Sequence, residues 1–182
     1  YKKPSKFITS KNFYVTKIKN NKGLTSTYKI FKENKVNVFS DDLYNISIFR
    51  NDTLISNCSL QLDVKGNKKN KKENYVFKNG TPKIKRNIKG PVLILSQGAS
   101  GYNYFHWFFD ILPKIYIVKK KYNLNYFNYL YLPKIKFDYQ KQTLNILKIP
   151  IKKILDSKKN KHFYSDEIVT CEHPYFKKSK WW

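Results

Sequence analysis

Two continuous apolar runs in the second half of the chain most constrain how it can fold. "PVLILS" (91–96) and "YLYLP" (129–133) contain no charged residue, which is typical of strands buried on both faces of a sheet. Each is followed by a segment with helical spacing, at about 103–121 and at 138–149. Further strands are expected at 152–156 and 166–171. Because buried strands alternate with helices, the sequence predicts an α/β domain with a Rossmann-like βαβ layer and a parallel sheet.

Residues 12 to about 60 follow a different pattern, in which short β-branched or aromatic runs are separated by the turn signals "NNKG", "SDD" and "RND". The expected strands are "FYVTKI", "KVNVFS", "ISIFR" and "TLISNCSLQL". They predict a small, mostly antiparallel β unit at 1–75, which ends in a solvated lysine-asparagine loop at 64–74. The Rossmann-like domain is placed at 76–182.

The formal net charge of +25 raises the question of a nucleic-acid partner. Of the 37 basic residues, however, only Arg50 and Arg86 are arginine, the side chain that reads guanine and grips phosphate best. The abundant lysine, asparagine, isoleucine, tyrosine and phenylalanine are the residues that an AT-rich genome over-supplies. The lysine-rich loop also has no interleaved aromatics for base stacking. We therefore expect no nucleic-acid partner.

Cysteine and histidine usage points to no metal or cofactor. Cys58 and Cys171 are far apart and belong to no paired motif, so the sequence predicts neither a disulfide framework nor a zinc site. His162 and His173 are interpreted as structural or solvent-facing. The tripeptide "CEH" (171–173) lacks the second pair of ligands that a metal site needs.

The ends of the chain suggest a fragment. The sequence contains no methionine, begins at Tyr1 and stops at Trp182, so we expect it to be cut at both ends. No stretch approaches the eighteen or so apolar residues that span a bilayer. A cytoplasmic or peripheral membrane location is expected for a bacterial-type protein, and the ER or Golgi lumen for a eukaryotic one.

One stretch, "SQGASGYNYFHWFFDILPK" (96–114), differs in character from the rest of the chain. At helical spacing its apolar side chains fall on one side. They are Phe108, Ile111, Leu112, Ile115 and Val118. Asn103, His106, Asp110 and Lys114 fall together on another side. Upstream, Gly98 and Gly101 allow a tight turn and close approach to a ligand at a helix N-terminus.

His106 and Asp110, four residues apart, can hydrogen-bond on a helix. A carboxylate beside an imidazole fixes its tautomer and favours its protonation, so the pair can act as a general base toward a hydroxyl nucleophile. Plainer interpretations stay open. Asn103 can be a helix cap, the pair can be structural, and Trp107 can belong to the core. Pro113 predicts a kink or a restart of the helix.

The segment "NYFHWFFDILPK" resembles the N-Y-x-H-W-x-x-[D/E]-x-L-P-[R/K] motif of glycosyltransferase family 61. The similarity continues through "YLYLP", "YQKQTLNILKIP", "KKILD" and "HFYSDEIVTCEHP", in the order expected of that family, and covers about 90–175. The family includes plant xylan-decorating transferases, animal O-linked N-acetylglucosaminyltransferases and bacterial polysaccharide enzymes.

The resemblance implies half of a GT-B-like enzyme, inverting and independent of metal, which moves a sugar from a nucleotide donor to an acceptor hydroxyl. This chain would supply the acceptor-side domain and be inactive alone, since the donor site would lie mostly in a missing C-terminal half. Consistently, the chain has no D-x-D triplet. The implied catalytic residues are His106 and Asp110. The implied substrate-binding residues are Asn103, Gly98, Gly101, Tyr104, Trp107 and Lys114.

The expected partners are a nucleotide-sugar donor and a glycan or glycolipid acceptor, and a basic face can hold such an enzyme against anionic lipid. Two other functions stay open at this point. One is a non-catalytic binding or assembly module of the same fold. The other is a lysine-rich nucleic-acid-binding protein.

Overall fold

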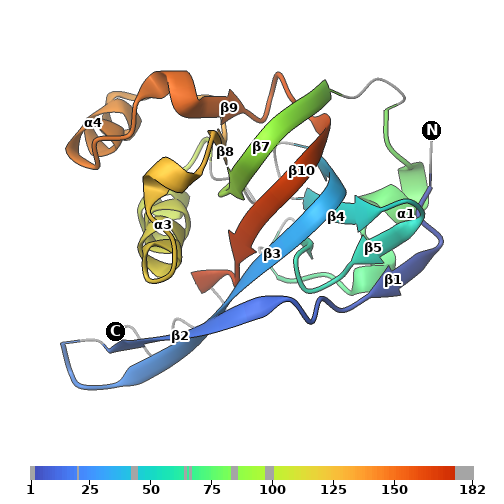
Figure 1. Cartoon of the computed structure of the whole chain (residues 1–182), viewed down its shortest axis with the longest axis horizontal. Helices are drawn as coiled ribbons and strands as arrows, with labels where there is room; N and C mark the ends of the chain where they lie inside the picture. The colour runs from blue at the N-terminus through green and yellow to red at the C-terminus, as the bar shows by residue number, and fades with distance from the viewer. Residues whose placement is uncertain are drawn as a thin grey trace.

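A computed structural model of the protein describes residues 3–19, 21–41, 45–63, 65, 67–82, 86–96 and 101–174. In this part of the chain one mixed sheet holds ten strands, in the order β1-β5-β4-β3-β10-β7-β8-β9, with β2 beside β3 and β6 beside β4 (Figure 1). The N-terminal strands are β1 (Lys6–Ile8), β2 (Phe13–Lys19), β3 (Thr25–Ser40), β4 (Asn45–Arg50), β5 (Thr53–Ile55) and β6 (Leu60–Gln61). The others are β7 (Arg86–Ile94), β8 (Tyr129–Leu132), β9 (Ile154–Asp156) and β10 (His162–Cys171). The α/β class expected from the sequence is confirmed.

The second half of the chain forms four parallel strands, β9-β8-β7-β10. The strands expected at 91–96, 129–133, 152–156 and 166–171 are all present. Two of them extend further toward the N-terminus than predicted, because β7 begins at Arg86 and β10 at His162. The chain runs from β7 to β8 and β9 on one side, and β10 then pairs with β7 on the other side.

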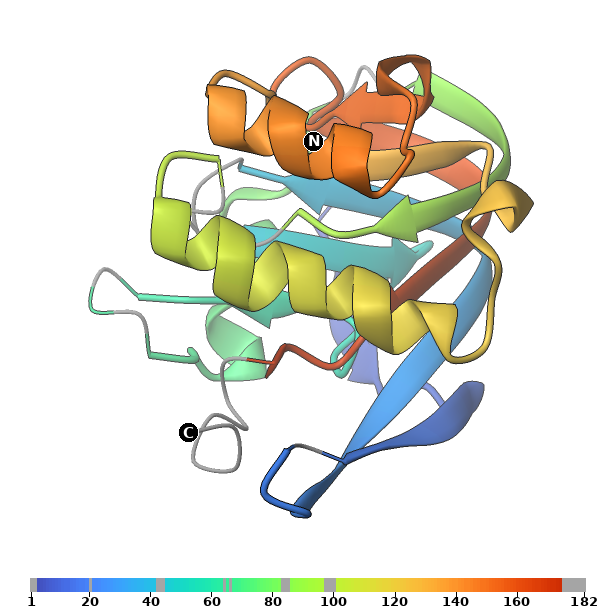
Figure 2. The ribbon, with the colours of Figure 1, turned by 90° about the vertical axis from the view of Figure 1, so that its left-hand side faces the viewer.

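The helices of the parallel half cover one face of the sheet (Figure 2). The segment after β7 comprises α2 (Tyr104–His106), a π-helical turn η2 (Trp107–Ile111) and α3 (Leu112–Lys119). Helix α4 (Asp138–Ile146) follows β8. The short 3₁₀ turns are η1 (Lys71–Glu73), η3 (Leu124–Tyr126) and η4 (Ile151–Lys153). The predicted apolar side of the first helix is confirmed, since Ile111, Ile115 and Val118 are buried against the sheet and Phe108 and Leu112 pack beside them.

The helix continues without a break through Pro113, where the sequence predicted a kink or a restart. Proline has no N–H with which to continue the ladder of hydrogen bonds. Just before it, the N–H of Leu112 donates to the carbonyl of Trp107, five residues earlier, which widens the helix into a π turn. Helix α3 then begins with the proline in its first turn. Such π turns are frequent at functional sites, and this one contains Asp110.

The N-terminal half is built around the sixteen-residue strand β3, which pairs antiparallel with β2, β4 and β10. Three of the four expected strands are present, although only 35–40 of β3 was predicted. The fourth, expected over 53–62, is divided by a turn into the short strands β5 and β6. Strands of both predicted segments, 1–75 and 76–182, therefore share one sheet. Side chains of β3 and β4, such as Val38 and Ile48, join Val92, Tyr131 and Phe163 in a second core cluster on the face of the parallel strands opposite to α3 and α4. Tyr28 and Ile30, at the start of β3, pack instead with the cluster under the helices.

The predicted loop at 64–74 contains a turn of helix. Within its described residues, η1 is closed by a capping box between Asn70 and Glu73, and α1 (Tyr75–Asn79) follows directly. Most of these side chains are exposed, as expected, but Asn74 is buried. No helix in the described ranges is long and apolar enough to cross a membrane.

Candidate functional site

The candidate site lies at the carboxyl ends of β7 and β10, which are parallel neighbours. After β7 the chain continues to β8 on one side, whereas β10 lies on the other side of β7. The strand order therefore reverses direction between β7 and β10. In open α/β sheets, ligands bind beyond the carboxyl ends of the strands at such a switch point. Gly98, one of the predicted site residues, lies outside the described residues.

His106 and Asp110 form the hydrogen bond expected from their spacing, with 2.6 Å between His106 Nδ1 and Asp110 Oδ2. Asp110 is 1% exposed, whereas the His106 side chain is 20% exposed. Because an ionised carboxylate only accepts hydrogen bonds, Nδ1 carries the proton in this contact. The lone pair of the neutral ring is then on Nε2, where it can accept a proton from a ligand.

His173 is the residue that the sequence interpretation missed. It follows β10, is 9% exposed, and places Nδ1 3.8 Å from Asp110 Oδ1. Asp110 therefore lies between two imidazoles, one from each side of the switch point. A signal was present in the sequence, because His173 comes directly after a predicted buried strand, and the carboxyl ends of parallel strands meet at one edge of the sheet.

Lys114 is fully buried, and its ammonium donates to the carbonyl of Leu95 at 3.3 Å. Burial lowers its pKa to about 8, while the nearby Cys171 and Asp110 oppose that shift. The prediction placed Lys114 among the substrate-binding residues. Because Lys114 is buried, it does not lie on the surface of the site. Its ammonium is instead an internal positive charge that interacts with Asp110.

Both cysteines are free and buried. Burial raises the pKa of the Cys171 thiol to about 12, an effect that the positive charge of Lys114 partly offsets. Burial also raises the pKa of Cys58. Neither thiol is poised to act as a nucleophile, since the reactive form is the thiolate.

The remaining predicted site residues have mainly structural contacts. Asn103 caps α2, as its Oδ1 accepts the N–H of Phe105 at 2.8 Å. Trp107 is buried and donates from Nε1 to the hydroxyl of Thr143 on α4 at 2.9 Å. Gly101 is buried beside Pro133. The helix therefore presents His106 and Asp110 toward β10 and Trp107 toward α4.

Tyr104 belongs to an aromatic group at the start of this helix and is 58% exposed. Its ring lies 4.4 Å from that of Phe108 and 5.0 Å from that of Tyr139, between centroids. Phe137 stacks on Tyr139 from the other side. These rings join the helix to the loop before α4 and leave an aromatic surface exposed near the site.

The described residues contain no group of three His, Cys, Asp or Glu side chains arranged to hold a metal ion. In the "CEH" tripeptide, His173 faces Asp110 and the Glu172 carboxylate accepts the backbone N–H of Lys29 at 2.8 Å. Comparisons with protein-family models, with curated proteins and with solved structures found no match to the chain.

Proposed function

We propose that the chain is part of an inverting, metal-independent glycosyltransferase in which His106 is the general base. The observation that carries the proposal is the 2.6 Å contact of His106 Nδ1 with buried Asp110, which leaves Nε2 available on a partly exposed ring. The family 61 motif around these residues is the second support.

The strand order supports a Rossmann-like interpretation of the parallel half. Numbered along the chain from β7, the order β9-β8-β7-β10 is 3-2-1-4, which matches the first four positions of the dinucleotide-binding order 3-2-1-4-5-6. In the proposed enzyme this half would hold the acceptor, a glycan or glycolipid. A further domain would hold most of the nucleotide-sugar donor, and a basic face would allow peripheral contact with anionic lipid.

In the proposed reaction, Nε2 of His106 takes the proton of an acceptor hydroxyl as its oxygen forms a bond to the anomeric carbon. The bond from that carbon to the nucleotide diphosphate breaks on the opposite face, which inverts the anomeric centre. Asp110 stabilises the imidazolium that forms, while the buried ammonium of Lys114 lies nearby and Nδ1 of His173 lies 3.8 Å from Asp110 Oδ1. The groups that stabilise the leaving diphosphate would come from the donor-binding domain.

The test is sugar transfer by the complete gene product from a panel of nucleotide sugars, with His106→Ala compared against wild type. We expect turnover to fall by roughly 10² to 10⁴, as for loss of a general base. His162→Ala is the matched control, because His162 faces the carbonyl of Pro82 at the other end of β10. That variant should keep its turnover.

Near-normal turnover in folded His106→Ala would refute the role of the base. Absence of transfer from every donor, together with saturable binding of glycans, would instead favour a non-catalytic binding module of the same fold.

A further inference from the structure

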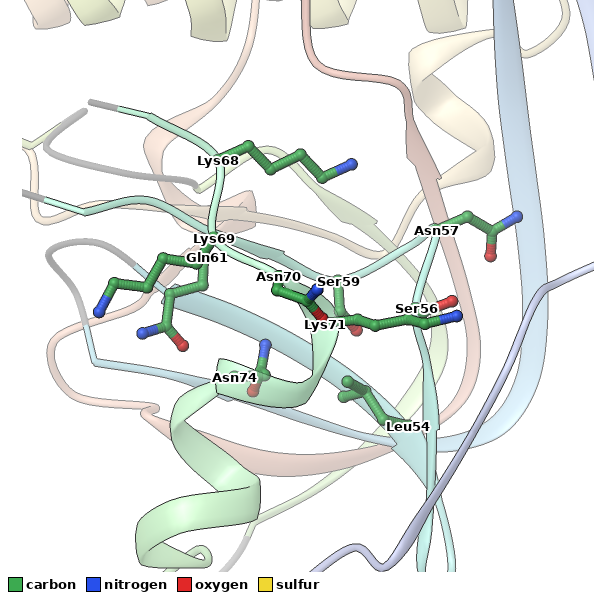
Figure 3. Close-up of a pocket in the computed structure, with 10 residues that line it drawn as sticks. All are labelled: Leu54, Ser56, Asn57, Ser59, Gln61, Lys68, Lys69, Asn70, Lys71 and Asn74. Carbon is green, nitrogen blue, oxygen red and sulfur yellow. The ribbon is translucent and has the colours of Figure 1, made fainter. Parts of the chain in front are cut away.

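A hollow in the N-terminal half has a lining that suits an anion. It has a volume of about 370 Å³ and lies between β5, β6 and the segment that leads into η1 and α1. Figure 3 shows the lining side chains, which include three lysines and four amides. They are Lys68, Lys69, Lys71, Asn57, Gln61, Asn70 and Asn74. No carboxylate is among the described residues that line it.

In three of these amides, Gln61, Asn70 and Asn74, the side-chain oxygen already accepts a hydrogen bond. Asn70 Oδ1 accepts the N–H of Lys72 at 3.0 Å, and Gln61 Oε1 accepts the N–H of Tyr75 at 2.5 Å. Asn74 Oδ1 accepts the N–H of Val76 and the hydroxyl of Ser47. Because a backbone N–H can only donate, these contacts fix which end of each amide is the oxygen.

The same contacts leave the three NH₂ groups as donors. Among the described residues, none accepts a hydrogen bond from the side-chain nitrogens of Gln61, Asn70 or Asn74. In Figure 3 the nitrogen of Asn74 lies on the side of its amide nearer Asn70, and the oxygen lies nearer α1. The hollow thus offers amide and ammonium donors with few acceptors, which is the complement of a group rich in acceptor oxygens.

Hydrogen bonds hold the walls of the hollow in place. Asn57 binds both the N–H and the carbonyl of Ser10, at 2.8 and 3.1 Å. The hydroxyl of Ser59 bonds to the backbone of β4 and β5. The ammonium of Lys71 lies 4.0 Å from the centre of the Phe7 ring. A lining that is ordered beforehand reduces the entropic cost of binding a ligand.

We propose that this hollow binds an oxyanion, a phosphate or carboxylate group of a larger ligand. Glu73, a carboxylate on the same segment, accepts the backbone N–H of Asn70 at 3.1 Å and does not line the hollow. The side chains that line the hollow therefore carry a net positive charge.

A second hollow, of about 260 Å³, extends this site toward the candidate active site. It shares Asn57, Ser59 and Lys68 with the first hollow and reaches Glu172 and His173. A ligand anchored by its oxyanion can therefore extend toward the residue that contacts Asp110. If such a ligand is the sugar acceptor of the proposed enzyme, then the acceptor is anionic. This second step rests on the proposed function, whereas binding of an oxyanion in the first hollow does not.

Two variants that differ only in location test the site. Asn70→Asp keeps the oxygen that caps η1 but replaces its NH₂ donor by a second carboxylate oxygen. Asn123→Asp makes the same change at η3, where Asn123 caps a 3₁₀ turn by accepting the N–H of Asn125. Asn123 is absent from the linings of both hollows. Both substitutions add one negative charge at an exposed helix cap.

The experiment is NMR titration of the full chain with pyrophosphate and, separately, with succinate, at about 0.15 M salt to screen nonspecific attraction. We expect saturable shifts in the side-chain NH₂ signals of Gln61, Asn70 and Asn74. Asn70→Asp should weaken binding at least about tenfold and Asn123→Asp less than about twofold. The anion that binds more tightly identifies phosphate or carboxylate as the preferred group.

Three results would overturn the proposal. They are shifts that do not saturate, shifts spread over surface lysines but missing from these three amides, and equal weakening by both variants. Because the readout is binding, its failure leaves the transfer assay of the proposed function unaffected, and the reverse also holds.

Discussion

Lys114 should give the protein an unusual dependence of stability on pH. Its pKa falls from 10.5 to about 8 because its ammonium is fully buried. At about 1.4 kcal/mol per pKa unit, keeping this charge in the fold costs roughly 3 kcal/mol at neutral pH. The unfolded chain binds this proton more tightly than the folded chain, so the free energy of unfolding should rise as the pH increases from about 8 toward 10.5.

The thiol of Cys171 acts in the opposite direction at higher pH. Its pKa is raised from 9.0 to about 12, so the unfolded chain loses this proton first and stability falls from about pH 8.5 upward. The buried thiol of Cys58 acts in the same way. From pH 7.5 to 9, Lys114 should add about 1.2 kcal/mol and each thiol should subtract about 0.4 kcal/mol, so the free energy of unfolding should increase by about 0.5 kcal/mol.

Urea denaturation followed by circular dichroism at pH 7.5, 8, 8.5 and 9 measures this increase. In Lys114→Met the increase should disappear, because the titrating group is gone. Lys119→Met, an exposed change on the same helix, should retain it. If folded Lys114→Met shows the same increase as the wild type, the buried ammonium is not its source and the reasoning fails.

Two further substitutions test how the helix that carries His106 is held. Trp107→Phe loses the hydrogen bond to Thr143 and part of a buried ring. Urea denaturation should therefore show a free energy of unfolding that is lower by about 2 kcal/mol. A change near zero would show that this contact is not formed. Gly101→Ala brings a new Cβ to 2.8 Å from Cβ of Pro133. We therefore expect thermal unfolding to show a free energy of unfolding that is lower by about 1–3 kcal/mol. An unchanged Tm would mean that the start of the helix is not packed against that proline.

The local parts of the site were accessible from sequence because they depend on short spacing. His106 and Asp110 are four residues apart, and the helix brings them together whatever surrounds it. The capping role of Asn103 is equally local.

Other features depend on distant partners and were missed. Residues 25–30 of β3 alternate buried and more exposed positions, yet two threonines and a lysine on the more exposed side and Ser26 on the buried side hid the strand among turn signals. Lys114 was placed on a polar side of the helix, but Leu95 and the end of β10 enclose it.

The sequence by itself determined the alternation of strands and helices, the apolar side of the helix and the His106–Asp110 pair, because periodicity and steric rules act over a few residues. Only the tertiary structure decided that β10 returns beside β7 and brings His173 to Asp110, and that the walls of the oxyanion hollow meet. Pairing of strands about eighty residues apart depends on burial and hydrogen bonding across the whole sheet, which no local pattern encodes.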